Sequence, residues 1–352
     1  MDRIKVAQIG CGYWGQNLIR NFWEVDEAQI IIACDAHAPA LARIQKRYPS
    51  VEVETSYDAV LNNPKVDAVV LATPVSTHFP FAKRALLAGK HLLIEKPMTT
   101  TTAEAAELIE LADRKNLKLM VDHTFLYTSA VRRMKQLVDA GELGDLLYFD
   151  SVRINLGLVQ SDTNVIWDLA PHDLSIMDYL CKPEPYAVSA VGTAHLNCPH
   201  ANIAYVTVKF NSNSNLIAHF HVNWLSPVKV RRTLVGGSKR MLVYDDMESS
   251  EKVKIYDKGV TFTQDSEQRT RMLAGYRNGD ILSPNLDTGE ALRLMAREFA
   301  TSILEDRTPL TDGQAGYRVV RLLEAAQRSL DEGREVFLSH SETSDRALAA
   351  TV

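Results

Sequence analysis

Three kinds of feature are scarce in this 352-residue sequence. It has no apolar run of the ~18 residues that span a bilayer, and its N-terminus lacks the charged-then-apolar plan of a signal peptide, so we expect a cytoplasmic protein. Its four cysteines form no CxxC pair, which argues against a zinc site or a redox pair. Its net charge of -5 leaves no basic excess, so neither nucleic acid nor a membrane surface is predicted as a partner.

The composition is that of an ordinary globular protein, with 46% hydrophobic and 24% charged residues, and the length predicts two domains. Residues 1–124 alternate short apolar runs with helix-like stretches, which is typical of a parallel α/β sheet. Residues 125–338 begin with a helix, continue as strands joined by turns and end with two helices, which predicts an α+β domain with an antiparallel or mixed sheet. Residues 339–352 are polar and unpatterned, and we expect a loose tail there.

A glycine-rich fingerprint follows the first apolar run. Gly10-Cys11-Gly12-Tyr13-Trp14-Gly15 has the GxGxxG spacing, comes directly after the strand-like residues 4–9 and opens a helix-like stretch. In a dinucleotide site the first glycine permits the tight turn, the second lets the pyrophosphate approach the backbone, and the third lets helix and strand pack closely. The positive end of the helix then faces the phosphates. All six residues are therefore candidates for binding a dinucleotide.

An acidic residue stands where the fingerprint requires one. Asp35 follows Gly15 by twenty residues, at the end of the second strand-like run, where a carboxylate hydrogen-bonds the adenine-ribose hydroxyls. The same charge repels a 2′-phosphate, and the following Ala36-His37-Ala38 supplies no Arg or Lys, so NAD is favoured over NADP. The alternative is a glycine-rich turn in an unrelated α/β domain.

Two later strand-like runs end in candidate site residues. Thr73-Pro74 ends one run and Glu95-Lys96-Pro97 ends another, and ligands of open parallel sheets bind beyond the carboxyl ends of the strands. These five residues are therefore candidates for the cofactor site, and His78 is included with them. The Lys96 ammonium could polarise a carbonyl or stabilise a developing alkoxide. The alternative is a solvated surface lysine.

Asp168 and His172 lie four residues apart, which places them on one face of a predicted helix. An imidazole can accept a hydroxyl proton near neutral pH, and the carboxylate can orient it or bind a substrate hydroxyl. The alternative is a helix-surface pair, or a capping Asp beside a core His. His219 and His221 share one face of a strand, but no third ligand accompanies them. We therefore expect no metal there, but a polar sheet face or a subunit contact.

Taken together, the glycine fingerprint, Glu95-Lys96-Pro97 and Asp168-x-x-x-His172 resemble the glucose–fructose oxidoreductase / inositol dehydrogenase / rhizopine-catabolism family, over roughly residues 3–335. The resemblance implies an NAD-binding Rossmann domain followed by a domain with a large, open, mostly antiparallel sheet. It implies that the exposed face of this sheet forms the interface of a homodimer or homotetramer. It also implies that Lys96 and His172 flank the reacting hydroxyl, with Asp168 close by. The residues before Asp168 depart from the glycine-rich stretch of many members, which bears on substrate fit.

A finer resemblance concerns the substrate. The run from Val165 to Leu180 looks like that of members in nucleotide-sugar and polysaccharide pathways, which oxidise or reduce C3 of UDP- or TDP-linked hexoses or N-acetylhexosamines. Arginine forks suit a diphosphate. The candidate substrate contacts are Thr124, Tyr127, Arg153, Asn155, Arg231 and Arg232. For the last two, an exposed salt-bridging pair is the alternative.

Two other functions remain open at this stage. One is an inositol or free-sugar dehydrogenase with the same chemistry. The other is a regulator that binds a dinucleotide without catalysis. The presence of Lys96, Asp168 and His172 argues against the regulator, because each has a part in the dehydrogenase chemistry.

Overall fold

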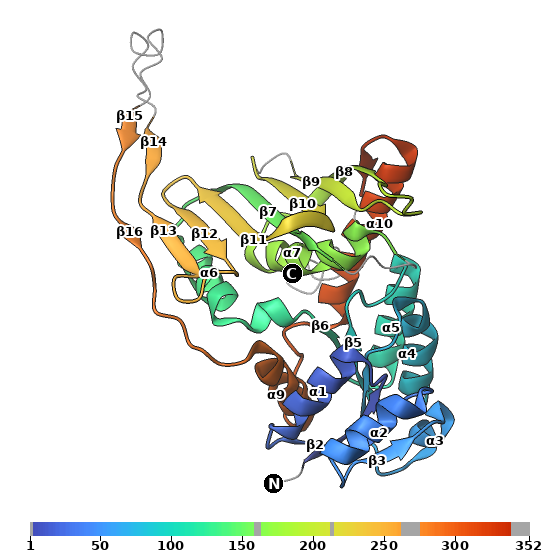
Figure 1. The fold of residues 1–352 in the computed structure, drawn as a ribbon. Coiled ribbons are helices and arrows are strands. Elements are labelled where there is room, and N and C mark those ends of the chain that lie inside the picture. The colour runs from blue at the N-terminus through green and yellow to red at the C-terminus, as the bar shows by residue number, and fades with distance from the viewer. Residues whose placement is uncertain (1–2, 158–162, 212–214, 262–274, 339–352) are drawn as a thin grey trace, which may run out of the picture. The chain divides into compact units, whose positions relative to one another are not determined.

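The computed structural model describes residues 3–157, 163–211, 215–261 and 275–338, so the predicted tail at 339–352 lies outside the described residues. The chain forms two compact units (Figure 1). The first unit consists of Met1–Val131 and Asp287–Glu324, and the second of Arg132–Leu286 and Ala325–Val352. The first unit therefore contains a segment from late in the chain as well as its N-terminal part.

A six-stranded parallel sheet forms the centre of the first unit. Its strand order is β3-β2-β1-β4-β5-β6, and every neighbouring pair is parallel. The strands are β1 (Ile4–Ile9), β2 (Ala28–Cys34), β3 (Glu52–Glu54), β4 (Ala68–Leu71), β5 (His91–Glu95) and β6 (Leu119–Asp122). The order reverses direction between β1 and β4, and such a switch point opens a crevice at the carboxyl ends of the strands. The predicted Rossmann topology is confirmed.

Helices cover both faces of this sheet, because its strands carry apolar residues on both sides. All four residues of β4 are buried, although successive side chains point to opposite faces. The capping residue Thr101 accepts a hydrogen bond from the backbone N–H of Glu104 and begins α5. The helical segments of this unit are α1 (Tyr13–Trp23), α2 (Ala38–Arg47), α3 (Tyr57–Asn62), η1 (Val75–Thr77), α4 (His78–Leu87), α5 (Thr102–Arg114), η2 (Thr124–Tyr127), α9 (Ala291–Leu304) and the first part of α10 (Gly313–Glu332).

A nine-stranded sheet forms the second unit, in the order β16-β13-β12-β11-β7-β10-β9-β8-β17. Only β7 and β10 pair in parallel, and the other neighbours pair in antiparallel fashion, as predicted. The strands are β7 (Leu146–Leu156), β8 (Pro185–Thr193), β9 (Ile203–Phe210), β10 (Ile217–Asn223), β11 (Leu225–Gly237), β12 (Met241–Asp245), β13 (Val253–Tyr256), β16 (Ile281–Leu282) and β17 (Val336–Phe337). Two more strands, β14 (Gly259–Thr261) and β15 (Gly275–Arg277), form a separate ribbon.

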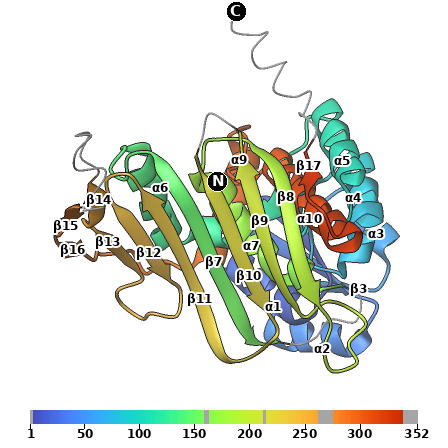
Figure 2. The ribbon, with the colours of Figure 1, turned by 90° about the horizontal axis from the view of Figure 1, so that it is seen from above.

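The two faces of this second sheet differ in chemistry. On β10, Ala218, Phe220 and Val222 are buried, and this strand packs against α7 (Val165–Leu180). Figure 2 shows the broad run of strands from above. On the other face the Tyr205 ring stacks on His221, with centroids 4.5 Å apart. The sheet therefore presents α7 on one side and a polar, aromatic surface on the other.

Candidate functional site

The glycine turn after β1 is shaped by close backbone approaches. Gly10 has φ +86°, and a Cβ there would lie 2.3 Å from the carbonyl oxygen of Ala72. A Cβ on Gly15 would lie 1.9 Å from the carbonyl oxygen of Gly10. At Gly12, by contrast, a Cβ would meet nothing within 4 Å. The first and third glycines are therefore required by the protein's own packing, and the second borders open space.

The N-terminus of α1 fits an anionic group. Its capping residue is Gly12, and no side chain among the described residues caps it. The first turn of α1 contains no acidic residue. The amide groups and the positive end of the helix are thus left for a ligand, which is what a pyrophosphate needs. Tyr13, 77% exposed, and the half-exposed Trp14 flank this end of the helix.

Asp35 holds the glycine turn to the end of β2. Its Oδ2 accepts a hydrogen bond from the backbone N–H of Cys11 at 2.6 Å, and its Oδ1 accepts one from that of His37 at 2.8 Å. The Cys11 side chain is buried, and burial raises the pKa of its thiol to about 12. Cys11 therefore stays a neutral thiol, and its backbone N–H is the group that meets the Asp35 carboxylate.

His78 connects the segments that follow β4 and β5. Its Nε2 lies 2.9 Å from the carbonyl oxygen of Thr73 and its Nδ1 2.9 Å from that of Pro97. The ring is buried, and burial lowers the pKa of His78. A neutral imidazole donates one N–H, to one of the two carbonyls. The His78 ring therefore lies between the segments that follow β4 and β5 and is hydrogen-bonded to one of them. The Lys96-Pro97 peptide after β5 is cis.

Two acidic side chains meet at the carboxyl ends of β5 and β6. Glu95 and Asp122 are register partners in the parallel pair, and their side chains are hydrogen-bonded. Asp122 is 3% exposed and accepts a hydrogen bond from the hydroxyl of Thr124. Burial, followed by the charge of Asp122, raises the pKa of Glu95 well above its usual range. Burial also raises the pKa of Asp122.

Sequence reasoning missed this acidic pair, although a signal was present. Asp122 is the last residue of an apolar strand, as Glu95 is, and adjacent parallel strands end at the same edge of the sheet. The neighbouring His123 was missed too. Its two ring nitrogens are buried and have no hydrogen-bond partner among the described residues. Burial, with the cations of Lys96 and Arg318, lowers the pKa of His123 to about 3, so this imidazole is neutral.

In the second unit, α7 carries Asp168 and His172. The side chain of Asn164 begins the helix by accepting hydrogen bonds from the backbone N–H groups of Ile166 and Trp167. Trp224, which is buried and lies between β10 and β11 in the chain, donates its indole N–H to Oδ2 of Asp168 at 2.9 Å. The segment that departs from the family's glycine-rich stretch is thus a capped helix start, and Asp168 is anchored to the sheet.

A buried ion pair joins α7 to β7 beside His172. Arg153 donates from Nε and a terminal nitrogen to the two carboxylate oxygens of Asp173, at 2.8 and 2.9 Å, and both side chains are 4% exposed. Arg153 was predicted to contact substrate. In the structure, two nitrogens of its guanidinium group instead donate to the Asp173 carboxylate of the same unit. A substrate contact by this residue stays a prediction.

The remaining candidate substrate residues are dispersed over their units. Arg231 pairs with Asp246 at 3.2 Å, and Arg232 with Asp245 at 2.7 Å. Tyr127 is buried, with its hydroxyl 3.1 Å from that of Thr311. Thr124 lies beside Asp122, and Asn155 is partly buried on β7.

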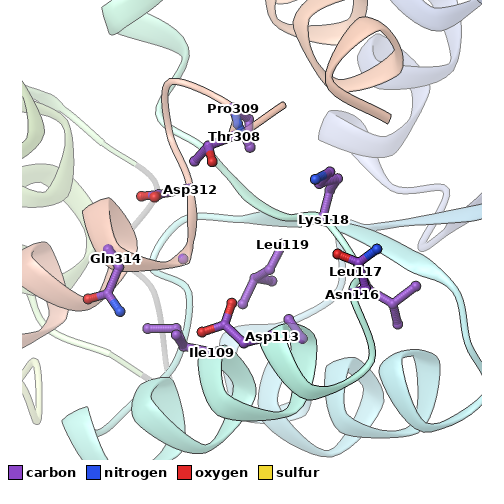
Figure 3. A pocket seen from close by; sticks show the side chains of 12 residues that line it. Ile109, Asp113, Asn116, Leu117, Lys118, Leu119, Thr308, Pro309, Asp312 and Gln314 are labelled. Carbon is purple, nitrogen blue, oxygen red and sulfur yellow. The ribbon is translucent and has the colours of Figure 1, made fainter. Parts of the chain in front are cut away.

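A hollow in the first unit lies at the opposite edge of the sheet. It is bordered by the end of α5, the start of β6 and the segment before α10 (Figure 3). Lys118 and Asp113 line it. Because parallel sheets bind ligands at the carboxyl ends of their strands, this hollow is not the candidate cofactor site. The candidate site is the edge that carries Gly12, Asp35, and the Glu95–Asp122 pair.

Two family models match successive parts of the chain. Residues 4–123 match a family model described as an oxidoreductase family with an NAD-binding Rossmann fold. Residues 131–243 match the GFO/IDH/MocA C-terminal domain. None of the helices among the described residues is long and apolar enough to cross a membrane.

Relatives and solved structures match over nearly the whole chain. A UDP-N-acetylglucosamine 3-dehydrogenase from Acidithiobacillus ferrooxidans is 29% identical over 91% of this chain and 95% of its own length. A solved structure described by the same enzyme name and organism has a TM-score of 0.80 at 27% identity, covering 94% of this chain and 99% of that one. A scyllo-inositol 2-dehydrogenase (NADP(+)) from Bacillus subtilis is 25% identical over 97% of both chains.

Proposed function

The chain belongs to the glucose–fructose oxidoreductase / inositol dehydrogenase / rhizopine-catabolism family of oxidoreductases, and we propose that it is an NAD(H)-dependent sugar dehydrogenase or ketoreductase. The proposed reaction transfers a hydride at a secondary hydroxyl, C3, of a nucleotide-linked hexose or N-acetylhexosamine. The observation that carries this proposal is the match, over 91% of the chain, to an enzyme named for C3 oxidation of UDP-N-acetylglucosamine.

The residues of the first unit fit a dinucleotide. The open side of Gly12 and the uncapped start of α1 suit its pyrophosphate. Asp35 suits the ribose hydroxyls of NAD, because its fixed carboxylate would repel the 2′-phosphate of NADP. The bound cofactor supplies the hydride acceptor or donor. One relative is named as NADP(+)-dependent, so the affinities of this chain for NAD⁺ and NADP⁺ should be measured side by side.

The protein's own groups would handle the proton and the developing charge. In the oxidation direction, His172 takes the hydroxyl proton and the Lys96 ammonium stabilises the alkoxide-like oxygen. Asp168, held by Trp224, orients His172 or binds a neighbouring hydroxyl. Lys96 belongs to the first unit and His172 to the second, so their meeting at one substrate oxygen is itself part of the proposal.

The proposed quaternary structure uses the second sheet. The face of this sheet with Tyr205, His219 and His221 is the candidate interface of a homodimer or homotetramer. Its stacked rings and part-buried polar groups suit burial against a second copy better than free exposure. Sedimentation of the purified chain tests this, and a monomer at micromolar concentration would contradict it. The proposed location is the cytoplasm.

A direct assay tests the function. Purified protein with NAD⁺ is offered UDP-N-acetylglucosamine, dTDP-glucose and, for the alternative free-polyol substrate, scyllo-inositol. We expect NADH formation and a raised melting temperature with a nucleotide sugar, since a ligand at 100 times its Kd stabilises the folded state by about 2.7 kcal/mol. Turnover with scyllo-inositol alone would favour the inositol dehydrogenase suggested by the Bacillus relative. NAD⁺ binding without turnover of any sugar would favour a regulator.

A further inference from the structure

The acidic pair at the edge of the first sheet has no part in the mechanism above. Glu95 and Asp122 are register partners on adjacent parallel strands, so their side chains leave the same side of the sheet next to each other. Asp122 is almost completely buried, and Glu95 is partly buried. Two ionised carboxylates in hydrogen-bond contact repel each other, and burial makes both charges more costly. Such a pair keeps one proton between its two members.

The surrounding donors indicate which member holds the proton. Thr124 donates its hydroxyl to Asp122, which favours the carboxylate form of Asp122. Glu95 accepts one long hydrogen bond, 3.2 Å, from the backbone N–H of Lys96. The proton therefore lies on Glu95, whose O–H donates to the Asp122 carboxylate.

Three titratable or charged side chains lie near the pair: Lys96, His123 and Arg318. Lys96 follows Glu95 directly, and its cation favours the ionised form of both acids. His123, which follows Asp122, is neutral, and Arg318 of α10 acts on it electrostatically. A pair with one proton thus places a single negative charge beside the Lys96 cation, instead of two.

We propose that Glu95 and Asp122 share one proton at neutral pH, and that Asp122 is thereby a positioning residue that sets the charge of Glu95 beside Lys96. The shared proton stands by itself, whereas the effect on turnover rests on the proposed function. Loss of the proton at higher pH adds a second negative charge beside Lys96. The ammonium is then drawn to the pair, and stabilises a substrate alkoxide less well.

Infrared spectroscopy of the full-length protein tests the proton without any ligand. We expect a carboxylic-acid carbonyl band at neutral pH. The band should shift in protein labelled with ¹³C at the glutamate side-chain carboxyl, stay in place with the corresponding aspartate label, and disappear in Glu95→Gln. Absence of the band at neutral pH would overturn the shared proton, and a shift with the aspartate label would overturn its place on Glu95. Both labelled samples are wild type, so the result does not depend on how a variant folds.

The positioning role is tested with Asp122→Asn. Without the charge of Asp122, Glu95 should lose its proton at a pH lower by about one unit or more, the usual effect of a nearby like charge. The alkaline limb of kcat/KM, measured with NAD⁺ and UDP-N-acetylglucosamine, should move in the same direction by a similar amount. The matched control is Asp67→Asn, because Asp67 binds the backbone N–H of Lys5 at the opposite edge of the same sheet.

The outcomes separate the two proposals. A displaced infrared transition with an unmoved kcat/KM profile would overturn the positioning role of Asp122. A melting temperature lowered without either displacement would reduce Asp122 to a structural residue, and would overturn the role as well. Wild-type protein that turns over no sugar would contradict the proposed function and the positioning role with it, while the infrared bands would still decide the shared proton.

Discussion

The two units hold their candidate site residues by different means. In the first unit the candidate residues are positioned mainly by backbone geometry and backbone hydrogen bonds. Gly10 and Gly15 have no room for a Cβ, Asp35 binds backbone N–H groups, and Lys96 stands at the end of a buried strand. In the second unit Asp168 is held by an indole N–H, and an ion pair lies next to His172 on the same helix. Backbone constraints can be recognised in the sequence as local motifs. Hydrogen bonds and ion pairs between buried side chains that are distant in sequence cannot.

The largest effects are expected from removing the groups assigned to the reaction. Lys96→Ala and His172→Ala should each lower kcat by ~10²–10⁴-fold, because each removes a proton acceptor or a charge stabiliser from the transition state. NAD⁺ affinity, followed by fluorescence titration, should change little. Lys115→Ala serves as the control, since its ammonium binds the carbonyl oxygen of Leu87 on the surface of the first unit. Less than a tenfold loss in both variants would contradict the mechanism.

The next effect concerns stability in the second unit. Asp173→Asn leaves the Arg153 cation buried without its counter-charge, and breaking such a pair costs about 3–5 kcal/mol. Arg232→Ala is the control within the same unit. Arg232 is 53% exposed, and exposed ion pairs contribute about 0–1 kcal/mol. Urea unfolding measures both. If both variants lose the same free energy of unfolding, burial does not make the Arg153–Asp173 pair more stabilising than the exposed one. The pair would then contribute no more than a surface ion pair to holding α7 on the sheet.

A smaller effect is expected at the cofactor end of the first unit. Asp35→Asn replaces one carboxylate oxygen by an NH2 group, which cannot accept a hydrogen bond from a backbone N–H, and it removes the charge that opposes a 2′-phosphate. Hydrogen bonds to charged groups contribute about 1.5–3 kcal/mol, so NAD⁺ affinity should fall at least tenfold. The ratio of NAD⁺ to NADP⁺ affinity should narrow. An unchanged ratio in calorimetric titrations would show that Asp35 serves the glycine turn alone.

Much of the first unit could be predicted, because its constraints are local. The fingerprint glycines, the acid at the second strand and the order of apolar runs predicted the sheet now observed. For the nine-stranded sheet, an antiparallel or mixed sheet was predicted but not the order of its strands. Neighbours such as β7 and β10 are distant in sequence and pair in parallel. The partnership of Glu95 with Asp122 was not seen, because it needs the register of two strands separated by a helix. The partnership of Arg153 with Asp173 was also not seen, since only packing of α7 on the sheet brings them together.

The smallest effect in the series concerns the dependence of stability on pH, and it shows whether the edge of the first sheet titrates. The pKa of Glu95 is raised on folding, mainly by burial. Its stabilising contribution is therefore fully present below the unfolded pKa of a glutamate, and is lost as pH rises through the raised value. A pKa that differs by one unit between the folded and unfolded states changes the free energy of unfolding by about 1.4 kcal/mol. As pH rises above about 4.3, the ordinary pKa of a glutamate, the wild type should lose stability relative to Glu95→Gln, because the amide cannot ionise.

The control for this last measurement is Glu110→Gln, which removes an exposed carboxylate of α5 that pairs with Arg114 at 3.3 Å. Its stability profile should run parallel to that of the wild type across the same pH range, since an exposed carboxylate is solvated equally well in both states. If Glu95→Gln also runs parallel to the wild type, the folded protein releases the Glu95 proton as readily as the unfolded chain does. The contribution of Glu95 to the free energy of unfolding would then be independent of pH, and burial at this edge of the sheet would not disfavour its charged form.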